Sequence, residues 1–216
     1  MTEDRILLLL LPGADMTAAD FETHDFIGAV RRRSAVEVIA VDTGIDCYLD
    51  DAIAGRLQAE IIGPARARGI ERIWIAGISL GGMGALRYAE AYPGMAEGLL
   101  LLSPFIGSRG LIDKIEAAGG IARWQEPAGG EQTPEHRLIA WIRDCHAGTR
   151  EWPDIRLAYG SEDRFAAAHR LLGAVLPADN VLVGPGGHDW ETWARLWERL
   201  LDMKPFAYRT MAGEQR

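Results

Sequence analysis

Short apolar runs alternate with stretches of helical spacing along most of this chain, and this alternation limits the folds that the chain can adopt. Strands flanked by helices in this way are typical of right-handed βαβ units, in which helices cover both faces of a parallel sheet. We therefore expect an α/β fold, a three-layer sandwich with about six parallel strands. The predicted strands are 6–11, 36–41, 73–76, 99–103, 155–159 and 181–183, and the predicted helices are 26–33, 57–66, 83–92, 166–176 and 190–201.

The chain length favours a single domain over residues 1–216. The 216 residues, 48% of them hydrophobic, supply one sizeable core but are few for two. The segment 104–153 breaks the alternation because it has no strand-like run. It holds one predicted helix over 111–118 and a second that begins with Thr133 as N-cap and Pro134 at the first helical position. We interpret 104–153 as a small helical cap inserted within the domain.

Charge, hydropathy and cysteine content exclude several classes of function. The formal net charge is −8 and three arginines at 31–33 form the only basic run, so a nucleic acid is not an expected partner. The apolar run that ends before Pro12 is too short for a signal peptide or a membrane span. Cys47 and Cys145 are too few for a disulfide framework and show no metal-ligand spacing. We expect a cytoplasmic protein that binds neither nucleic acid nor membrane.

The sequence G-I-S-L-G at 77–81 lies between a predicted strand and a predicted helix. A serine on such a sharp turn has strained backbone angles that expose its hydroxyl, and residues two places before and after it must be very small. Gly77 and Gly81 occupy these places around Ser79. The pattern predicts a nucleophile elbow, and it leaves open a glycine-rich turn that only packs a helix onto a strand.

The residues after the elbow are also small. We expect Gly82, Gly84 and Ala85 to let the following helix approach the sheet closely. The N-terminal dipole of that helix would favour negative charge beside Ser79. A phosphate-binding loop is not expected because neither G-x-G-x-x-G nor G-K-[ST] is present.

A serine hydroxyl needs a base to become a nucleophile, and the base needs a carboxylate that orients it. Asp163 follows the predicted strand 155–159, and His188 follows the predicted strand 181–183. Both therefore belong to the same edge of the sheet as Ser79, and the order Ser, Asp, His is the one associated with this elbow. We predict Ser79, Asp163 and His188 as a catalytic triad.

Two neighbouring acids and four further histidines have alternative interpretations. Glu162 could replace Asp163 as the acid, and Asp189 is either the N-cap of the next helix or a second carboxylate in the chemistry. No metal or other cofactor is expected. The histidines outside the triad have no metal-ligand spacing and are expected to be structural or exposed: His24, His136, His146 and His169.

Acyl transfer also needs N–H donors for the oxyanion of the tetrahedral intermediate. The first expected donor is the backbone N–H of Leu80, directly after the nucleophile. The second is expected in the loop after the first strand, where Gly13 permits unusual backbone angles and Pro12 has no N–H to give. Ala14 is our first choice, with Asp15 or Met16 as alternatives.

These residues together resemble the α/β-hydrolase superfamily over nearly the whole chain. The resemblance implies Ser79 as nucleophile, Asp163 as acid, His188 as base and Leu80 as oxyanion donor. The stretch G-G-H-D-W-E-T-W at 186–193 is also similar to esterase D type carboxylesterases. Two departures stand out. We expect the first two strands of the full superfamily sheet to be absent, because the sequence starts on the strand that precedes the oxyanion loop. P-G replaces the familiar H-G at that loop.

The apolar residues of 104–153 either line an acyl pocket or only bury the cap's own helices. We predict Gly13, Phe105 and Ile106 as substrate-binding residues. The other apolar candidates in the cap are Leu111, Ile112, Ile115, Ile121, Trp124 and Trp141, whereas Trp190, Trp193, Leu196, Trp197 and Leu200 fall at helical spacing and are expected to be core.

The sequence therefore predicts a cofactor-independent serine hydrolase that cleaves a carboxylic ester with a small or medium acyl group through an acyl-enzyme on Ser79. A thioesterase with the same triad is the alternative within this chemistry. A non-catalytic hydrolase-fold protein that binds a small molecule is the alternative outside it. The expected partner is a small-molecule ester or thioester.

Overall fold

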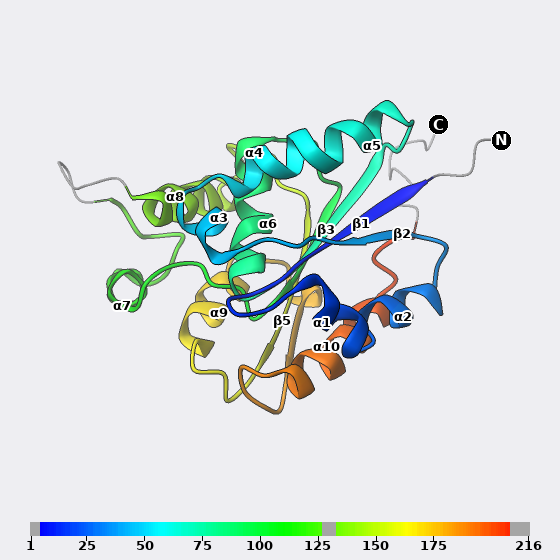
Figure 1. Ribbon diagram of the computed structural model, residues 1–216. Helices are drawn as coiled ribbons and strands as arrows, with labels where there is room; N and C mark the ends of the chain where they lie inside the picture. Colours follow the sequence, from blue (N-terminus) through cyan, green and yellow to red (C-terminus); the bar gives the residue numbers. More distant parts are fainter. Residues whose placement is uncertain (1–4, 127–132, 208–216) are drawn as a thin grey trace, which may run out of the picture.

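The sheet of the computed structural model, which describes residues 5–126 and 133–207, has six parallel strands in the order β2-β1-β3-β4-β5-β6 (Figure 1). All six predicted strands are present, with ends that differ by one or a few residues. The strands are β1 (Ile6–Leu11), β2 (Glu37–Ala40), β3 (Arg72–Ile78), β4 (Gly98–Leu102), β5 (Asp154–Gly160) and β6 (Val181–Gly184).

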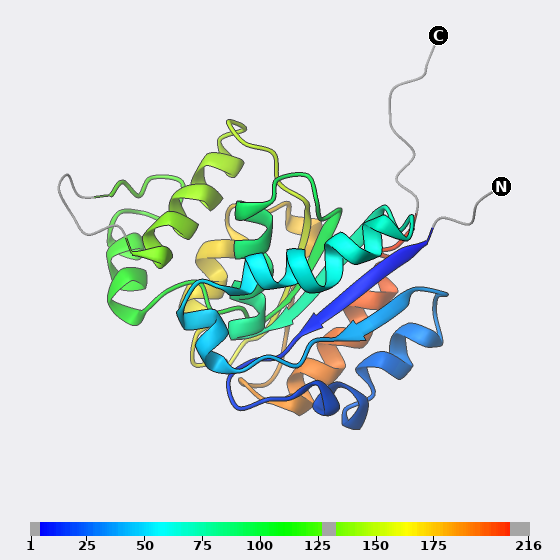
Figure 2. The same ribbon diagram turned by 45° about the horizontal axis from the view of Figure 1, so that its top comes forward.

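Helices cover both faces of the sheet (Figures 1 and 2). The α-helices are α1 (Ala18–Thr23), α2 (Phe26–Arg31), α3 (Ile45–Leu49), α4 (Ile53–Leu57), α5 (Gly63–Ala67), α6 (Leu80–Ala91), α7 (Arg109–Ala117), α8 (Pro134–His146), α9 (Ala166–Gly173) and α10 (Trp190–Asp202), with a π-helical turn η1 (Gln58–Ile62) and a 3₁₀ turn η2 (Ala178–Asn180).

Strand β1 shows why the core has two layers. Its six residues, ILLLLL, are all buried, as expected of a central parallel strand with helices on both faces. Leu7, Leu9 and Leu11 face a cluster formed with α4, α6, α8 and α9. Leu8 and Leu10 face the opposite cluster, formed with α1, α2 and α10. The predicted three-layer α/β sandwich is therefore confirmed.

The pairing of β1 with β3 brings two loops together at one edge of the sheet. Leu11 at the end of β1 pairs with Gly77 in β3. The loop that begins at Pro12 therefore leaves the sheet beside the turn that holds Ser79. Because the other strands run parallel to these two, the loops after β5 and β6 leave at the same edge.

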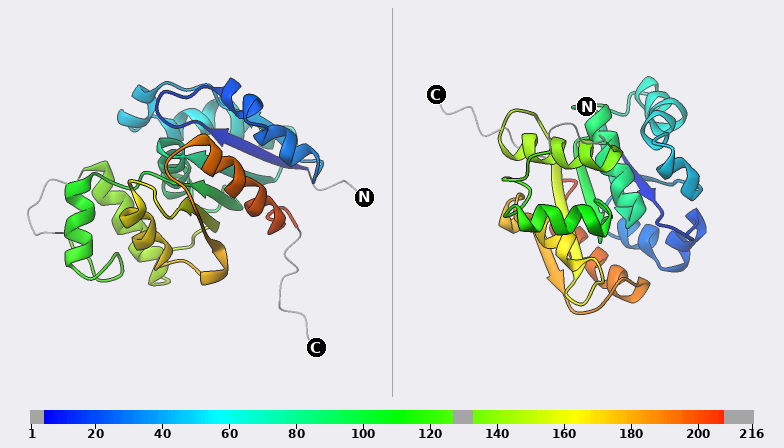
Figure 3. Two further views of the ribbon diagram at one scale, coloured as in Figure 1. Left: turned by 90° about the horizontal axis from the view of Figure 1, so that it is seen from below. Right: turned by 90° about the vertical axis from the view of Figure 1, so that its left-hand side faces the viewer.

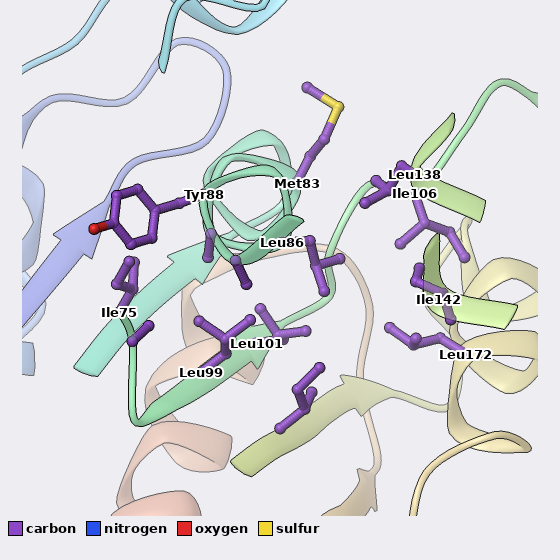
Figure 4. Packing of buried hydrophobic residues seen from close by; sticks show 14 of the residues in the cluster. Ile75, Met83, Leu86, Tyr88, Leu99, Leu101, Ile106, Leu138, Ile142 and Leu172 are labelled. Carbon is purple, nitrogen blue, oxygen red and sulfur yellow. The ribbon is translucent and has the colours of Figure 1, made fainter. Parts of the chain in front are cut away.

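The segment 104–153 contributes α7 and α8, as two views from other directions show (Figure 3). Thr133 is the N-cap of α8, and its Oγ1 accepts the backbone N–H of His136 at 3.4 Å. Leu138 and Ile142 on α8 join the core cluster next to α6 (Figure 4). Residues 127–132 of this segment lie outside the described residues, and its function as a cap stays a prediction.

Within the described ranges, no helix is both long and apolar enough to cross a membrane.

Candidate active site

Ser79 lies on a sharp turn between β3 and α6 with backbone angles that are unusual for a residue with a side chain. Its φ is 53° and its ψ is −114°. Four backbone hydrogen bonds hold the turn. Ser79 N–H donates to the carbonyl of Leu102 at 3.0 Å. The Ser79 carbonyl accepts from Gly82 at 3.0 Å, from Met83 at 3.3 Å and from Phe105 at 2.9 Å. The turn is therefore strained and fixed from both sides.

The glycines around Ser79 leave room for backbone. A Cβ on Gly77 would overlap the carbonyl of Gly81, and a Cβ on Gly81 would overlap the carbonyl of Leu11. A Cβ on Gly13, in the loop after β1, would lie 3.2 Å from the Cβ of Ser79. Close backbone approach therefore explains Gly77 and Gly81, and the nearness of Ser79 explains Gly13.

The two later glycines face different neighbours. A Cβ on Gly82 would lie 2.6 Å from the Cβ of Pro104 and 3.3 Å from the carbonyl oxygen of Gly77, so Gly82 does bring α6 close to the strand ends. A Cβ on Gly84 would lie 2.7 Å from the ring of Tyr48. The expectation that Gly84 lets the helix approach the sheet was wrong, because the missing side chain of Gly84 leaves room for the ring of Tyr48 on α3 instead.

The structure brings Ser79, His188 and Asp163 together in a hydrogen-bonded chain. Nε2 of His188 lies 3.1 Å from Oγ of Ser79. Nδ1 of His188 lies 2.8 Å from Oδ2 of Asp163. The second carboxylate oxygen of Asp163 accepts the backbone N–H of Phe165 at 2.8 Å. These contacts hold the imidazole between a hydroxyl and a carboxylate.

The Asp163 carboxylate is ionised in this environment. Its side chain is fully buried, which by itself raises the pKa, but the hydrogen bonds from His188 and from the N–H of Phe165 outweigh burial and lower the pKa to about 2. The carboxylate therefore carries its charge at neutral pH and favours the His188 tautomer with a proton on Nδ1.

Two aromatic rings enclose the imidazole of His188. The ring of Phe165 lies 5.1 Å from it, and the ring of Trp193 lies 4.9 Å from it on α10, both in edge arrangements. The His188 side chain is only 8% exposed as a result. Sequence reasoning assigned Trp193 to the core and did not single out Phe165. The signals available were the position of Phe165 two residues after Asp163 and that of Trp193 one helical turn after Asp189.

The N–H groups of the predicted oxyanion donors have no acceptor in the ranges that the structure describes. Leu80 is the first residue of α6, and among the described residues neither its N–H nor that of Ala14 has an intramolecular acceptor. The N–H of Gly13 is different, because it donates to the sulfur of Met16 at 3.2 Å. The carbonyl of Pro12 accepts the buried hydroxyl of Tyr48 at 2.8 Å. Ala14 therefore stays our predicted second donor, with Asp15 and Met16 as the alternatives.

The alternative acids lie in other environments. Glu162 is exposed, whereas Asp163 beside it is buried. Asp189 is the N-cap of α10, since its carboxylate accepts the N–H of Thr192 at 2.9 Å, and this bond lowers its pKa.

The remaining histidines have structural contacts. His24 stacks on Trp190, His136 bonds Thr133, His146 bonds the Val175 carbonyl, and His169 packs on Tyr159. In the described part of the chain, no group of three or more His, Cys, Asp and Glu side chains is placed to hold a metal ion.

Phe105 and Ile106, the cap residues predicted to bind substrate, point to different places. Phe105 is partly buried, and its ring lies 6.3 Å from that of Phe165 at the site. Ile106 is 1% exposed and packs in the core near Leu138 and Ile142 (Figure 4). Its predicted contact with substrate stays a prediction, which this burial does not support. The other apolar cap candidates are buried as well: Leu111, Ile112, Ile115, Ile121, Trp124 and Trp141.

Comparison with known proteins shows similarity at the level of structure. No protein-family model and no curated protein sequence matches this chain. Among solved structures, it is similar to the fluorophosphonate-binding serine hydrolase F of Staphylococcus aureus, at a TM-score of 0.66 and 16% identity over 94% of this chain and 85% of that chain.

Two further solved structures are also similar to this chain in fold at low sequence identity. An S-formylglutathione hydrolase from S. aureus has a TM-score of 0.64 at 17% identity, over 94% of this chain and 82% of that chain. A carboxylesterase from Bacillus subtilis has a TM-score of 0.55 at 16% identity, over 95% of this chain and 86% of that chain. The chain has the α/β-hydrolase fold, and the resemblance seen in the sequence is confirmed at that level.

Proposed function

On this α/β-hydrolase fold, we propose a serine hydrolase that cleaves a carboxylic ester with a small or medium acyl group. The observation that carries the proposal is the hydrogen-bonded chain from Asp163 through His188 to Ser79. A strained serine, a base within hydrogen-bond distance and a buried ionised carboxylate are together the parts that nucleophilic acyl transfer needs.

In the first half-reaction, Oγ of Ser79 attacks the ester carbonyl carbon while Nε2 of His188 takes the hydroxyl proton. Asp163 holds the imidazole and stabilises its positive charge. The carbonyl oxygen becomes an oxyanion that accepts hydrogen bonds from the N–H groups of Leu80 and Ala14. The intermediate collapses when the bond to the alkoxy oxygen breaks, and His188 gives its proton to the departing alcohol.

The second half-reaction repeats these steps with water. Nε2 of His188 takes a proton from a water molecule, whose oxygen attacks the acyl carbon on Ser79. The second oxyanion uses the same two N–H groups. Its collapse releases the carboxylic acid and returns the proton to Oγ of Ser79. No cofactor takes part in this scheme.

Thioester cleavage is the alternative within this chemistry, since only the leaving atom differs. The similar solved structures include proteins described as a carboxylesterase and as an S-formylglutathione hydrolase, so they support both substrates. A binding protein without turnover is the alternative outside it. The strain at Ser79 favours an enzyme over a binding protein, because binding alone needs no exposed nucleophile.

We further propose that residues 1–216 form one hydrolase domain with 104–153 as its cap, and that this domain acts in the cytoplasm. Leu138 and Ile142 support the first point, since α8 shares the core of the domain. Cys47 and Cys145 support the second, since both are free thiols, as is usual in a reducing compartment.

The test is intact mass after exposure to a fluorophosphonate, with Ser79→Ala as the matched control. We expect one adduct on the parent protein and none on the variant. Esters and thioesters of increasing acyl length then identify the preferred leaving atom. A folded parent protein that forms no adduct would contradict the proposal and favour the binding protein.

A further inference from the structure

A pocket of about 440 Å³ lies beside the proposed active site, between the start of α7 and the start of α9. Its volume is in the range of small-molecule sites. The wall shared with the triad is Phe165, whose ring packs against His188. The lining residues are Gly107, Arg109, Ile112, Asp113, Arg164, Phe165, Ala167 and Ala168.

The two arginines of this pocket have no acidic partner in the described part of the chain. Among residues 5–126 and 133–207, neither Arg109 nor Arg164 has a carboxylate within ion-pair distance. The chain holds 31 acidic against 23 basic residues, so carboxylates are in excess, and most of its other arginines are paired. Two unpaired guanidinium groups at one pocket are suited to bind an anion, because each offers a fork of N–H donors.

The other residues at the pocket give it an apolar surface and two nearby carboxylates. Ile112, Phe165 and the two alanines give it an apolar surface. Asp113 is the acid among the lining residues, so these residues carry one net positive charge. Glu135 is close to Gly107, and its carboxylate accepts the N–H of Ser108 at 2.9 Å.

The guanidinium group of Arg164 lies near the imidazole of His188, with the ring of Phe165 in contact with both. The guanidinium carbon of Arg164 lies 4.9 Å from the centre of the Phe165 ring, and that ring lies 5.1 Å from the His188 ring. The guanidinium and the imidazole are therefore at most about 10 Å apart, the sum of these two separations. A substrate that reaches from Ser79 past Phe165 would meet the arginine.

We propose that this pocket binds an anionic group, a carboxylate or phosphate, which the substrate carries at the end of an apolar spacer from the scissile ester. The proposal rests on the proposed function, because it assigns the substrate of the same triad. It narrows the substrate class from a simple ester to an amphipathic one with a negative charge at one end.

The test compares charged esters with neutral esters of the same shape. One pair carries the charge in the acyl part, phenyl adipate against its terminal amide. The other carries it in the alcohol part, the butyrate ester of 3-(4-hydroxyphenyl)propionate against its amide. The ratio of kcat/KM within each pair isolates the charge, and the two pairs show which side of the ester occupies the pocket.

We expect the parent protein to favour the charged ester at least tenfold in one pair. Arg109→Gln and Arg164→Gln should each lower that ratio about tenfold, as for the loss of one charge-assisted hydrogen bond, without changing turnover of the neutral ester. Asp113→Asn should raise the ratio, since it removes the opposing charge. Arg170→Gln is the control, because it removes an exposed arginine of α9 that does not line the pocket.

Suppose that fluorophosphonate labels the protein but kcat/KM is equal within both pairs. This result would contradict the proposed anion-binding pocket and would leave the proposed serine hydrolase function standing. An equal effect of Arg170→Gln would also overturn the pocket, since only net charge would then matter. If the parent protein is not labelled, the proposed function fails instead. Calorimetric titration of Ser79→Ala with phenyl adipate and its amide then tests the pocket without turnover.

Discussion

The hydroxyl of Tyr48 donates a buried hydrogen bond of 2.8 Å to the carbonyl of Pro12. Tyr48 lies on the short helix α3, and Pro12 begins the loop that supplies Gly13 and Ala14 beside Ser79. Burial raises the pKa of the Tyr48 hydroxyl, so the group stays protonated at neutral pH. A helix outside the triad therefore anchors the proposed oxyanion loop.

Removing this hydroxyl should loosen the loop. Tyr48→Phe keeps the ring and leaves the Pro12 carbonyl buried without a donor, which costs about 1–3 kcal/mol of unfolding free energy. We expect kcat for an ester to fall as well, because the N–H of Ala14 is held less firmly where the oxyanion forms. Denaturant unfolding and steady-state kinetics measure the two effects.

Tyr88→Phe is the matched control. The Tyr88 hydroxyl donates to Oε1 of Gln58 at 2.7 Å, away from the oxyanion loop. This variant should lose stability through the same kind of bond and keep its kcat. If both variants lower kcat equally, Tyr48 does not act through the loop.

A methyl group at Gly81 should disrupt the elbow. The Cβ of Gly81→Ala would overlap the carbonyl of Leu11, a backbone group that cannot move without shifting β1. We expect a loss of several kcal/mol of stability and of fluorophosphonate labelling. Gly55→Ala is the comparison, since nothing lies within 4 Å of its added Cβ in α4, and it should stabilise the fold by about 0.5–1 kcal/mol. Equal stability of both variants would contradict the close approach at the elbow.

The sheet and the positions of the triad residues could be predicted because each depends on local pattern. β1 and β4 are buried on both faces and therefore read as continuous apolar runs. Ser79, Asp163 and His188 each follow a parallel strand of the sheet, and parallel strands place their following loops at one edge. The position of each residue directly after a strand was therefore enough to predict that the three lie close together.

Features that depend on packing between distant segments could not be predicted. Helix α3 has five residues and a single buried one, Tyr48, so no apolar stripe marks it. Ile106 is apolar and follows a strand, but only the position of α8 decides that it is core. The partners of His188 come from two elements, and the sequence does not indicate that the rings of Phe165 and Trp193 meet at it.

Asp163→Asn should leave folding nearly unchanged and lower turnover by about 10⁴, the loss known for the corresponding change in serine proteases. The asparagine can still accept the N–H of Phe165, but it no longer favours the His188 tautomer that leaves Nε2 free to take the Ser79 proton. Ester kinetics and unfolding curves measure the change. Glu162→Gln alters the exposed neighbour and should keep turnover within about twofold. If Glu162→Gln lost turnover and Asp163→Asn kept it, the acid of the triad would be Glu162.

His169 should make the fold sensitive to mild acid. Burial lowers its pKa from 6.5 to about 4, so between these values the unfolded chain binds a proton that the folded chain does not. Stability should therefore fall as pH drops from 6.5 to 4, by up to about 3 kcal/mol from this group at about 1.4 kcal/mol per pKa unit. Asp163, whose pKa is lowered from 3.8 to about 2, loses its contribution to the free energy of unfolding only below pH 4.

His169→Phe keeps a ring against Tyr159 without a titrating group. The free energy of urea unfolding should therefore differ less between pH 7 and pH 4.5 in this variant than in the parent protein. An unchanged difference would mean that His169 is protonated in the folded state.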